Sequence, residues 1–457
     1  MGNRDVTGLA VETTSGVVYG FVDRGVPNWR GVPYGRVEER FRPPHPVTPA
    51  ERVDADRWGP VAWQVPIYAG TSWSAVHSDA VEREDCLNLN LWSPGADPAA
   101  RRPVLVWLHP GGHVYGCGSM PTVDAWVFAA RHDAVIVTAN YRLGPWGWLY
   151  LGDADPAFKD SANLAVLDQV MLLRWIQDNI ERFGGDPDNV TIFGSSSGAS
   201  DVATLMGVPA ARGLFHKAAI YSGNAEEPRP RGDAVDLAGQ FLAAAGSLAG
   251  SPAELAALPN VAIRRIHRRL LQDGLVPYGP FIDGDIIPRL PLDSIAAGLS
   301  QDVPVLVSTT AEEGGMYEAF SADSLDHMYT SHVGPVGGVS HAEKVAALTR
   351  TLFVEPAERL LTAVTGTGGV GWAQVFDYHP TVSPLAAFPA VAGRAVHGVD
   401  LSALFIDPEG TAGDETDRAV GADEQAALMG LAREGRPDWA PWSPESRAVE
   451  RIEPISP

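Results

Sequence analysis

Apolar residues along this chain gather in runs that have the length of buried strands. Six of these runs are rich in β-branched and aliphatic side chains, and segments with a helical pattern separate them. They cover residues 104–109, 134–140, 189–193, 217–222, 303–309 and 372–378. Strands that alternate with helices predict an α/β fold, in which helices cover both faces of a mostly parallel sheet.

One helix is clearly marked between residues 166 and 180, because its apolar residues follow steps of three and four positions. A Gly-Gly-Asp-Pro sequence at 184–187 ends it, and the apolar run at 189–193 follows.

Residues 263–270 also have a helical pattern, so their four arginines predict a solvated helix face rather than a nucleic-acid patch. The Gly/Pro-rich residues 333–339 predict a loop, either at a substrate entrance or elsewhere on the surface.

The composition fits one large α/β unit. The chain has 457 residues, of which 45% are hydrophobic, and this can bury a large core. We therefore expect a single domain over residues 1–457. The formal net charge of −22 predicts a strongly acidic surface. Because nucleic acids and anionic membranes attract basic surfaces, this charge argues against both as partners.

No segment predicts export or membrane insertion. The first residues lack the apolar core of a signal peptide, and the apolar runs are too short to cross a bilayer, so we expect a cytoplasmic protein.

Two cysteines, Cys86 and Cys117, are too few for a disulfide framework, and metal-binding cysteine spacing is absent. Lysine is nearly missing whereas arginine is abundant, which is typical of a GC-rich bacterial genome.

The sequence Gly-Ser-Ser-Ser-Gly at 194–198 fits G-x-S-x-G, a sharp turn that exposes a nucleophilic serine between a strand and a helix. The apolar run at 189–193 precedes it, and residues from Ala199 onward can form a helix. The flanking glycines select Ser196 as the nucleophile. Five residues with three fixed positions recur by chance, so the assignment depends on whether a base, an acid and oxyanion donors are present as well.

Candidates for the acid and the base follow the serine in the order that this turn predicts. The run at 303–309 leads into Glu312 and Glu313, and we favour Glu313 because the glycine after it permits a tight turn. Glu312 remains the alternative. His397 lies in a loop of small residues after the last predicted strand, and its place in the chain order favours it over His379.

The oxyanion donors are expected in a glycine-rich loop after an earlier strand. The run at 104–109 leads into Pro110, Gly111, Gly112 and His113. Consecutive glycines let backbone N–H groups turn toward one point without a Cβ in the way. A phosphate-binding loop is disfavoured, because the Lys-Ser/Thr ending of such loops is absent.

Several longer motifs extend this pattern over most of the chain. They are Trp-Arg-Gly-Val-Pro-Tyr at 29–34, Glu-Asp-Cys-Leu-Asn-Leu-Asn at 84–90, His-Pro-Gly-Gly-His at 109–113, Asn-Tyr-Arg-Leu-Gly at 140–144, Leu-Asp-Gln at 167–169 and Phe-Gly-Gly-Asp-Pro-Asp-Asn at 183–189. With the serine turn, they resemble the signatures of the type-B carboxylesterases, the group that includes the cholinesterases, within the α/β-hydrolase fold.

The resemblance implies a catalytic triad of Ser196, Glu313 and His397. It also implies an oxyanion hole formed by the N–H groups of Gly111, Gly112 and Ser197. The expected reaction is hydrolysis of a small-molecule carboxylic ester through an acyl-enzyme, with no metal or organic cofactor. Whether the protein is a monomer or a homodimer stays open.

The chain departs from the family pattern at several positions. Ser195 and Ser197 replace a common Glu and Ala, and losing that Glu puts in doubt the preference of cholinesterases for cationic ligands. His113 replaces the usual Phe. It either lines the pocket, as Ser195 and Trp146 also could, or is structural. Family members with a disulfide here pair the equivalent of Cys86 with an upstream cysteine. No cysteine precedes Cys86, so we expect a free buried thiol, with pairing to Cys117 as the disfavoured alternative. The chain is short for the family, and residues 225–300 and 314–356 are expected to be helical or loop insertions that shape the pocket.

Two other classes of function stay open. An amide, carbamate or lactone hydrolase, or an acyltransferase, would share the chemistry up to the acyl-enzyme. A non-catalytic interaction domain is disfavoured, because all three triad candidates and both loop glycines are present.

Overall fold

The computed structural model describes residues 9–65, 80–272, 278–320 and 323–454. The start of the chain, on which the expectation of no signal peptide depends, lies outside the described residues. So do residues 273–277 and 321–322 of the two expected insertions.

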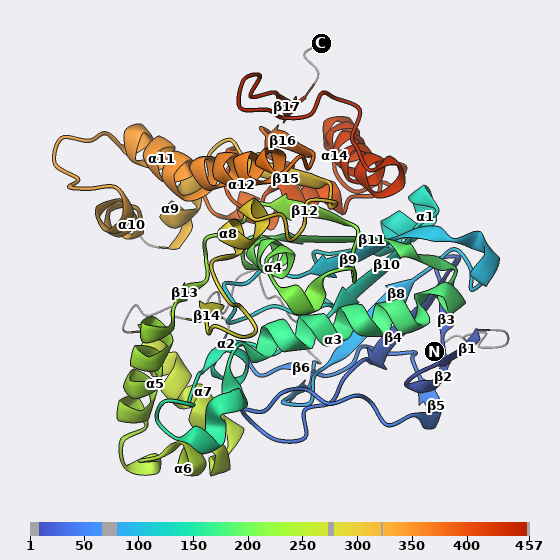
Figure 1. Cartoon of the computed structure of the whole chain (residues 1–457). Coiled ribbons are helices and arrows are strands. Elements are labelled where there is room, and N and C mark those ends of the chain that lie inside the picture. Colours follow the sequence, from blue (N-terminus) through green and yellow to red (C-terminus); the bar gives the residue numbers. More distant parts are fainter. Residues whose placement is uncertain (1–8, 66–79, 273–277, 321–322, 455–457) are drawn as a thin grey trace.

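The predicted α/β architecture is present, with a ten-stranded, mostly parallel sheet at its centre (Figure 1). In spatial order the strands are β17 (Val449–Ile452), β16 (Gly371–Phe376), β15 (Val305–Thr310), β12 (Lys217–Tyr221), β11 (Gly185–Ser195), β9 (Arg102–Leu108), β10 (Val135–Ala139), β8 (Asn88–Trp92), β4 (Val26–Pro33) and β3 (Phe21–Asp23). All six predicted apolar runs form strands of this sheet. Neighbouring strands from β17 to β10 are parallel, whereas β8, β4 and β3 continue the sheet in antiparallel pairs.

Among the described residues, three small sheets lie outside the main one. They are the sheet of β1 (Ala10–Thr13), β2 (Gly16–Tyr19) and β5 (Ala50–Asp54), the pair β6 (Val61–Ala62) and β7 (Glu82–Arg83), and the pair β13 (Arg229–Pro230) and β14 (Phe281–Ile282). The pair β13–β14 joins two parts of the segment between β12 and β15.

Helices pack along the parallel strands. Those that contact the main sheet are α1 (Trp126–His132), α3 (Leu164–Asn179), α4 (Ser197–Met206), α12 (Glu355–Gly366) and α14 (Glu415–Glu434). Shorter helices include α2 (Gly144–Trp148), α8 (Pro291–Ala296) and α13 (Asp400–Leu404). The structure confirms the predicted helix at 166–180 as α3, and the one after Ala199 as α4.

The two expected insertions contain two groups of helices that project to the left in Figure 1. The lower group is α5 (Arg231–Ala245), α6 (Pro252–Ala257) and α7 (Asn260–Gln272). The upper group is α9 (Tyr317–Phe320), α10 (Ser324–His332) and α11 (His341–Thr349). Ile263, Ile266 and Leu270 of α7 are buried, as the helical pattern predicts, whereas Val261 in its first turn is exposed. The Gly/Pro-rich residues 333–339 form the loop between α10 and α11.

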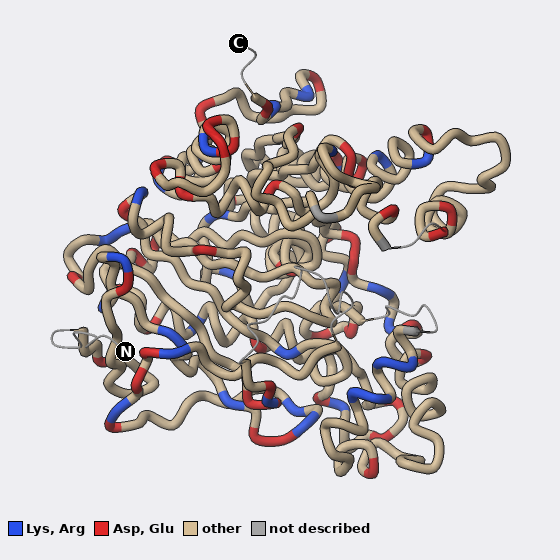
Figure 2. Tube along the Cα trace, turned by 180° about the vertical axis from the view of Figure 1, so that it is seen from behind, with Lys and Arg blue, Asp and Glu red and all other residues tan. Residues whose placement is uncertain are grey.

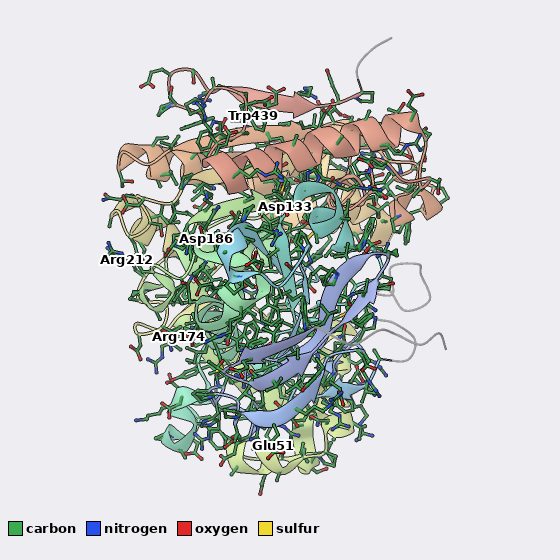
Figure 3. The ribbon with its side chains drawn as sticks, turned by 90° about the vertical axis from the view of Figure 1, so that its right-hand side faces the viewer. Glu51, Asp133, Arg174, Asp186, Arg212 and Trp439 are labelled. Atoms are coloured by element: carbon green, nitrogen blue, oxygen red, sulfur yellow. The ribbon has the colours of Figure 1, made fainter. Side chains whose placement is uncertain are left out.

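The C-terminal residues complete the parallel end of the sheet. After α14 the chain turns back, and Trp439 lies near both this helix and β17 (Figure 3). The indole of Trp372 in β16 donates a hydrogen bond to the carbonyl of Trp439 at 3.2 Å. This contact ties the C-terminal segment to the edge of the sheet.

Charged residues are spread over the surface rather than gathered by sign. Figure 2 shows Asp and Glu on most of the outer elements, with Lys and Arg between them. Within the described residues, none of the helices is both long enough and apolar enough to cross a bilayer.

A buried ion pair joins two of the family-like motifs. The Arg142 guanidinium binds both carboxylate oxygens of Asp168 in α3, at 2.6 and 2.8 Å, and both side chains are almost fully buried. The carboxylate also accepts the backbone N–H of Arg142. The pair therefore fixes the segment after β10 to the helix that leads toward the serine turn.

We expect Asp168→Asn to lower the free energy of unfolding by about 3–5 kcal/mol, because it leaves the Arg142 charge buried without a counter-charge. Urea denaturation followed by circular dichroism measures the change. Asp54→Asn is the matched control, since Asp54 pairs with Arg52 on the open surface and such pairs contribute little. Equal denaturation midpoints for the two variants would contradict this account of the pair.

Candidate active site

Ser196 lies at the turn between β11 and α4, where the sequence places it. Its backbone has φ 54° and ψ −129°, a conformation that non-glycine residues rarely adopt. The Ser196 N–H donates to the carbonyl of Tyr221, at the end of the neighbouring strand β12, at 2.9 Å. The strained turn is thus held by the strand beside it.

The two glycines that flank the serine turn are required by close packing. A Cβ on Gly194 would lie 2.5 Å from the backbone of Gly198. A Cβ on Gly198 would lie 2.2 Å from the carbonyl oxygen of Leu108, at the end of β9. The turn can therefore press against the strand that leads into the glycine-rich loop only because both residues lack a side chain.

Parallel pairing brings the candidate residues to one edge of the sheet. Gly194 is opposite Leu108, Ser195 is opposite Tyr221, and Tyr221 is opposite Ser308. The segments that follow these strands carry Ser196, the glycine-rich loop and Glu313. Ligands of open α/β sheets bind at this carboxyl edge.

His397 and Glu313 are joined by a short hydrogen bond. The Nδ1 atom of His397 lies 2.7 Å from Oε2 of Glu313, and both side chains are buried. The ring of Phe353 packs against the imidazole with centroids 5.1 Å apart. Because Glu313 occupies Nδ1, the Nε2 atom of His397 is the one left for another partner.

The second oxygen of Glu313 is held by two groups that the sequence did not single out. Oε1 accepts the hydroxyl of Ser222 at 2.5 Å and the backbone N–H of Thr310 at 2.8 Å. Ser222 directly follows β12, and Thr310 is the last residue of β15. A place at the end of a predicted strand is the one feature of the sequence that could have indicated these two donors. Together they fix the carboxylate in one orientation.

The two alternative residues have other partners. Glu312 is half exposed and binds the Arg394 guanidinium at 2.6 Å. The Nδ1 atom of His379 pairs with the carbonyl of Arg394 at 2.8 Å. The structure therefore brings Glu313, and not Glu312, into contact with His397.

The environment of His397 raises its pKa. Burial alone lowers it, but the charge and hydrogen bond of Glu313, with a further contribution from Asp400, leave the pKa of His397 above 6.5. Asp400, which begins α13, is a second buried acid that no sequence pattern singles out. Burial, followed by the charge of Glu313, raises the pKa of Asp400 to about 7.

The glycine-rich loop has a left-handed backbone at three successive residues. The φ angles are 135° at Gly111, 59° at Gly112 and 61° at His113. A Cβ on Gly111 would lie 1.9 Å from the carbonyl oxygen of Tyr115, so the loop can close only with glycine there. Ser197 starts α4, and the first N–H groups of a helix have no acceptor within it.

The Asn-Tyr-Arg-Leu-Gly motif at 140–144 packs against this loop and supports it. Tyr141 donates its hydroxyl to the carbonyl of His109 at 2.7 Å, and its ring stacks on the His109 ring with centroids 4.3 Å apart. Asn140 accepts the N–H of Gly118 at 2.7 Å. These contacts anchor both ends of the loop on the segment after β10.

The three residues with an open role are all buried. Ser195 is fully buried, and within the described residues its hydroxyl has no hydrogen-bond partner. The indole of Trp146 stacks on that of Trp63, with ring centroids 6.1 Å apart, and donates its N–H to the side-chain oxygen of Asn260. His113 binds Asp201 of α4 through Nε2 at 3.0 Å. All three side chains are thus packed inside the molecule rather than on its surface.

Both cysteines are buried and neither forms a disulfide, as the sequence predicts for Cys86. Burial raises the pKa of both thiols, which keeps them protonated and unreactive at neutral pH. Among the described residues, no group of three or more His, Cys, Asp or Glu side chains is arranged to hold a metal ion.

Comparisons with known proteins find similar sequences over most of this chain. Residues 7–333 match the model of the carboxylesterase family. The chain is 32% identical to the para-nitrobenzyl esterase of Bacillus subtilis, over 97% of this chain and 94% of that protein. It is 36% identical to the phenmedipham hydrolase of Pseudarthrobacter oxydans, over 69% of this chain and 64% of that one.

Solved structures are similar over almost the whole chain. A para-nitrobenzyl esterase superposes with a TM-score of 0.85 at 30% identity, covering 98% of this chain and 96% of that one. A carboxylesterase of Geobacillus stearothermophilus gives 0.83 at 30% identity, covering 97% and 96%. The match of the family model and these similarities show that the chain belongs to the carboxylesterase family.

Proposed function

We propose that this protein hydrolyses small-molecule carboxylic esters with Ser196 as nucleophile, His397 as general base and Glu313 as the acid that orients the base. The observation that carries the proposal is the hydrogen bond between His397 Nδ1 and Glu313 Oε2, at the sheet edge where the strained turn presents Ser196. A serine hydroxyl needs such a base to attack an ester at neutral pH.

The reaction proceeds in two halves. Ser196 Oγ attacks the ester carbonyl while His397 Nε2 accepts its proton, and the tetrahedral intermediate then collapses as His397 protonates the leaving alcohol. Water repeats the sequence on the acyl-enzyme and releases the acid. Throughout, Glu313 keeps the proton of the neutral ring on Nδ1 and stabilises the imidazolium that forms.

The N–H groups of Gly111, Gly112 and Ser197 are the proposed oxyanion donors. The left-handed glycine conformations and the start of α4 support this assignment, because both leave backbone N–H groups free to point toward a substrate. Pro110 cannot donate, and the assignment does not require it to do so.

The two insertions are proposed to shape the substrate pocket. Phe353, in the segment 314–356, packs on the ring of His397. Glu227 and Gly279, in the segment 225–300, both lie beside His113 of the glycine-rich loop. Each insertion thus touches one part of the proposed machinery.

A panel of matched esters and amides tests the reaction class, with Ser196→Ala as the blank and an added alcohol as a competing acceptor. We expect rapid ester hydrolysis, little turnover of amides and water as the main acceptor. Preferred transfer to the alcohol would favour an acyltransferase. The absence of any turnover above the blank would contradict the proposal.

The rate should fall at acid pH because protonated His397 cannot accept the serine proton. We expect the acid limb of kcat/KM to have an apparent pKa above 6.5, since Glu313 raises the pKa of His397. Rates of p-nitrophenyl butyrate hydrolysis across the neutral range, measured at constant ionic strength, give this value. Glu312→Gln serves as the control and should leave the limb in place. A limb below 6.5 in the wild type would contradict the assignment of His397 and Glu313.

A further inference from the structure

We propose that His113 positions the oxyanion loop as a cation shared between two carboxylates, one on the helix that follows Ser196 and one on the insertion after β12. The inference rests on the proposed function, because it concerns the geometry of the same oxyanion hole. It gives His113 a role different from lining the pocket.

The first link joins the loop to α4. His113 Nε2 lies 3.0 Å from Oδ1 of Asp201, and both side chains are almost completely buried. The second oxygen of Asp201 accepts the side-chain amide of Gln169 in α3 at 2.7 Å. Asp201 is therefore fixed in place. It holds His113, the residue that follows Gly112, against α4, the helix that starts at Ser197.

The second link joins the loop to the insertion between β12 and β15. His113 Nδ1 lies 3.5 Å from Oε1 of Glu227, whose side chain is partly exposed. Gly279 passes beside the same nitrogen, and a Cβ there would lie 3.2 Å from it. Glycine at position 279 thus keeps the approach to Nδ1 open.

The pairing of two carboxylates with two ring nitrogens favours the charged ring. A neutral imidazole donates from only one nitrogen, whereas an imidazolium donates from both. Burial lowers the pKa of His113, but the charges of Asp201 and Glu227 more than offset this and leave it above 6.5. Other charged or titratable groups lie around the ring. Arg229 of β13 lowers the pKa of His113, and His109 lies directly after β9. Tyr141 is the third, and burial raises its own pKa well above 10.

The ring is also enclosed on its remaining sides. The indole of Trp148 packs edge-on against the imidazole, with ring centroids 4.7 Å apart. The backbone carbonyl of His113 accepts the N–H of Gly144 at 2.7 Å. A side chain held in this way fixes the left-handed backbone at His113, and with it the direction of the preceding N–H groups. Preorganised donors of this kind act mainly on the transition state rather than on substrate binding.

The test compares His113→Gln and Glu227→Gln with the wild type and with His132→Gln, a half-buried histidine of α1 that pairs with Gln425. Each is assayed for kcat and KM on p-nitrophenyl butyrate across neutral and alkaline pH. Affinity for a trifluoromethyl ketone, whose carbonyl adds Ser196 and places an oxyanion in the hole, is measured alongside. Circular dichroism checks folding.

We expect His113→Gln to lower kcat and ketone affinity together, by about 10- to 100-fold, with KM nearly unchanged. The wild type should lose kcat on the alkaline side as His113 deprotonates, and His113→Gln should lack this loss. Glu227→Gln should keep the fold and shift the alkaline loss to lower pH, because one carboxylate that raises the pKa of His113 is gone. His132→Gln should resemble the wild type.

Wild-type kcat, ketone affinity and pH profile in both variants would overturn the proposal. If His113→Gln does not fold, Glu227→Gln decides alone, and an unchanged alkaline limb there overturns it. A change in KM alone would also overturn it, since this indicates a substrate contact. Equal activity of wild type and Ser196→Ala would overturn the proposed function itself, and with it this inference.

Discussion

Ser196→Ala is expected to lower kcat for ester hydrolysis by about 10⁴- to 10⁶-fold. The serine oxygen forms the bond to the acyl group, and without it water must attack the ester directly. KM should change little, because the pocket and the oxyanion donors stay in place. The residual rate measures what binding and the oxyanion hole contribute alone.

The neighbouring serines supply matched controls within the same turn. Ser195→Ala removes a buried hydroxyl without a protein partner among the described residues, and Ser197→Ala leaves the backbone N–H in place. Both variants should keep most of the activity. If either of them lost activity as Ser196→Ala does, or if Ser196→Ala kept wild-type kcat, the choice of Ser196 among the three serines would be wrong.

Glu313→Gln is expected to lower kcat by about 10⁴-fold with the fold intact. Ser222 and Thr310 both donate to the Oε1 position, so the amide oxygen of glutamine will occupy that place. Its NH₂ group then faces His397 Nδ1 and can only donate to it. This forces the proton of the neutral ring onto Nε2, where it prevents the histidine from accepting the serine proton.

Glu312→Gln is the control for this variant, since it is next in sequence and changes the same atoms. It weakens a partly exposed ion pair with Arg394 and should leave kcat near the wild-type value. Purified variants compared on one p-nitrophenyl ester give both numbers. A mild effect at Glu313 with a large one at Glu312 would reverse the assignment of the acid.

The parallel half of the sheet could be predicted from sequence because its strands are buried on both faces. Val104 to Leu108 form a continuous buried apolar run, and β15, which is buried throughout, begins with three aliphatic residues, Val305 to Val307. The register of such strands then places the ends of successive runs at one edge. That relation makes the chain order of serine, acid and base interpretable from the amino-acid sequence alone.

The antiparallel strands could not be predicted in this way. β4 contains two prolines and a glycine, and β8 alternates leucine with buried asparagines. The polar residues are satisfied by distant partners: Asn90 accepts the N–H of Gly31, and Asn88 donates to the carbonyl of Pro60. Sequence patterns do not show which buried amide will find such a partner.

The same limit applies to the polar network around the candidate site. His113 and Asp201 are 88 positions apart, and Ser222 and Glu313 are 91 apart. Neither pair has a local pattern that links its members. The residues proposed to react with substrate were therefore easier to predict than those that hold them in position.

The most direct test of the account is covalent labelling of the native protein with a fluorophosphonate, which reacts with an activated serine and displaces fluoride. Intact mass should increase by one phosphonyl group per chain, and peptide mapping should place the adduct on Ser196, with loss of ester hydrolysis in proportion. Ser196→Ala should not be labelled. Labelling at another serine, or full inhibition without an adduct on Ser196, would contradict the central claim.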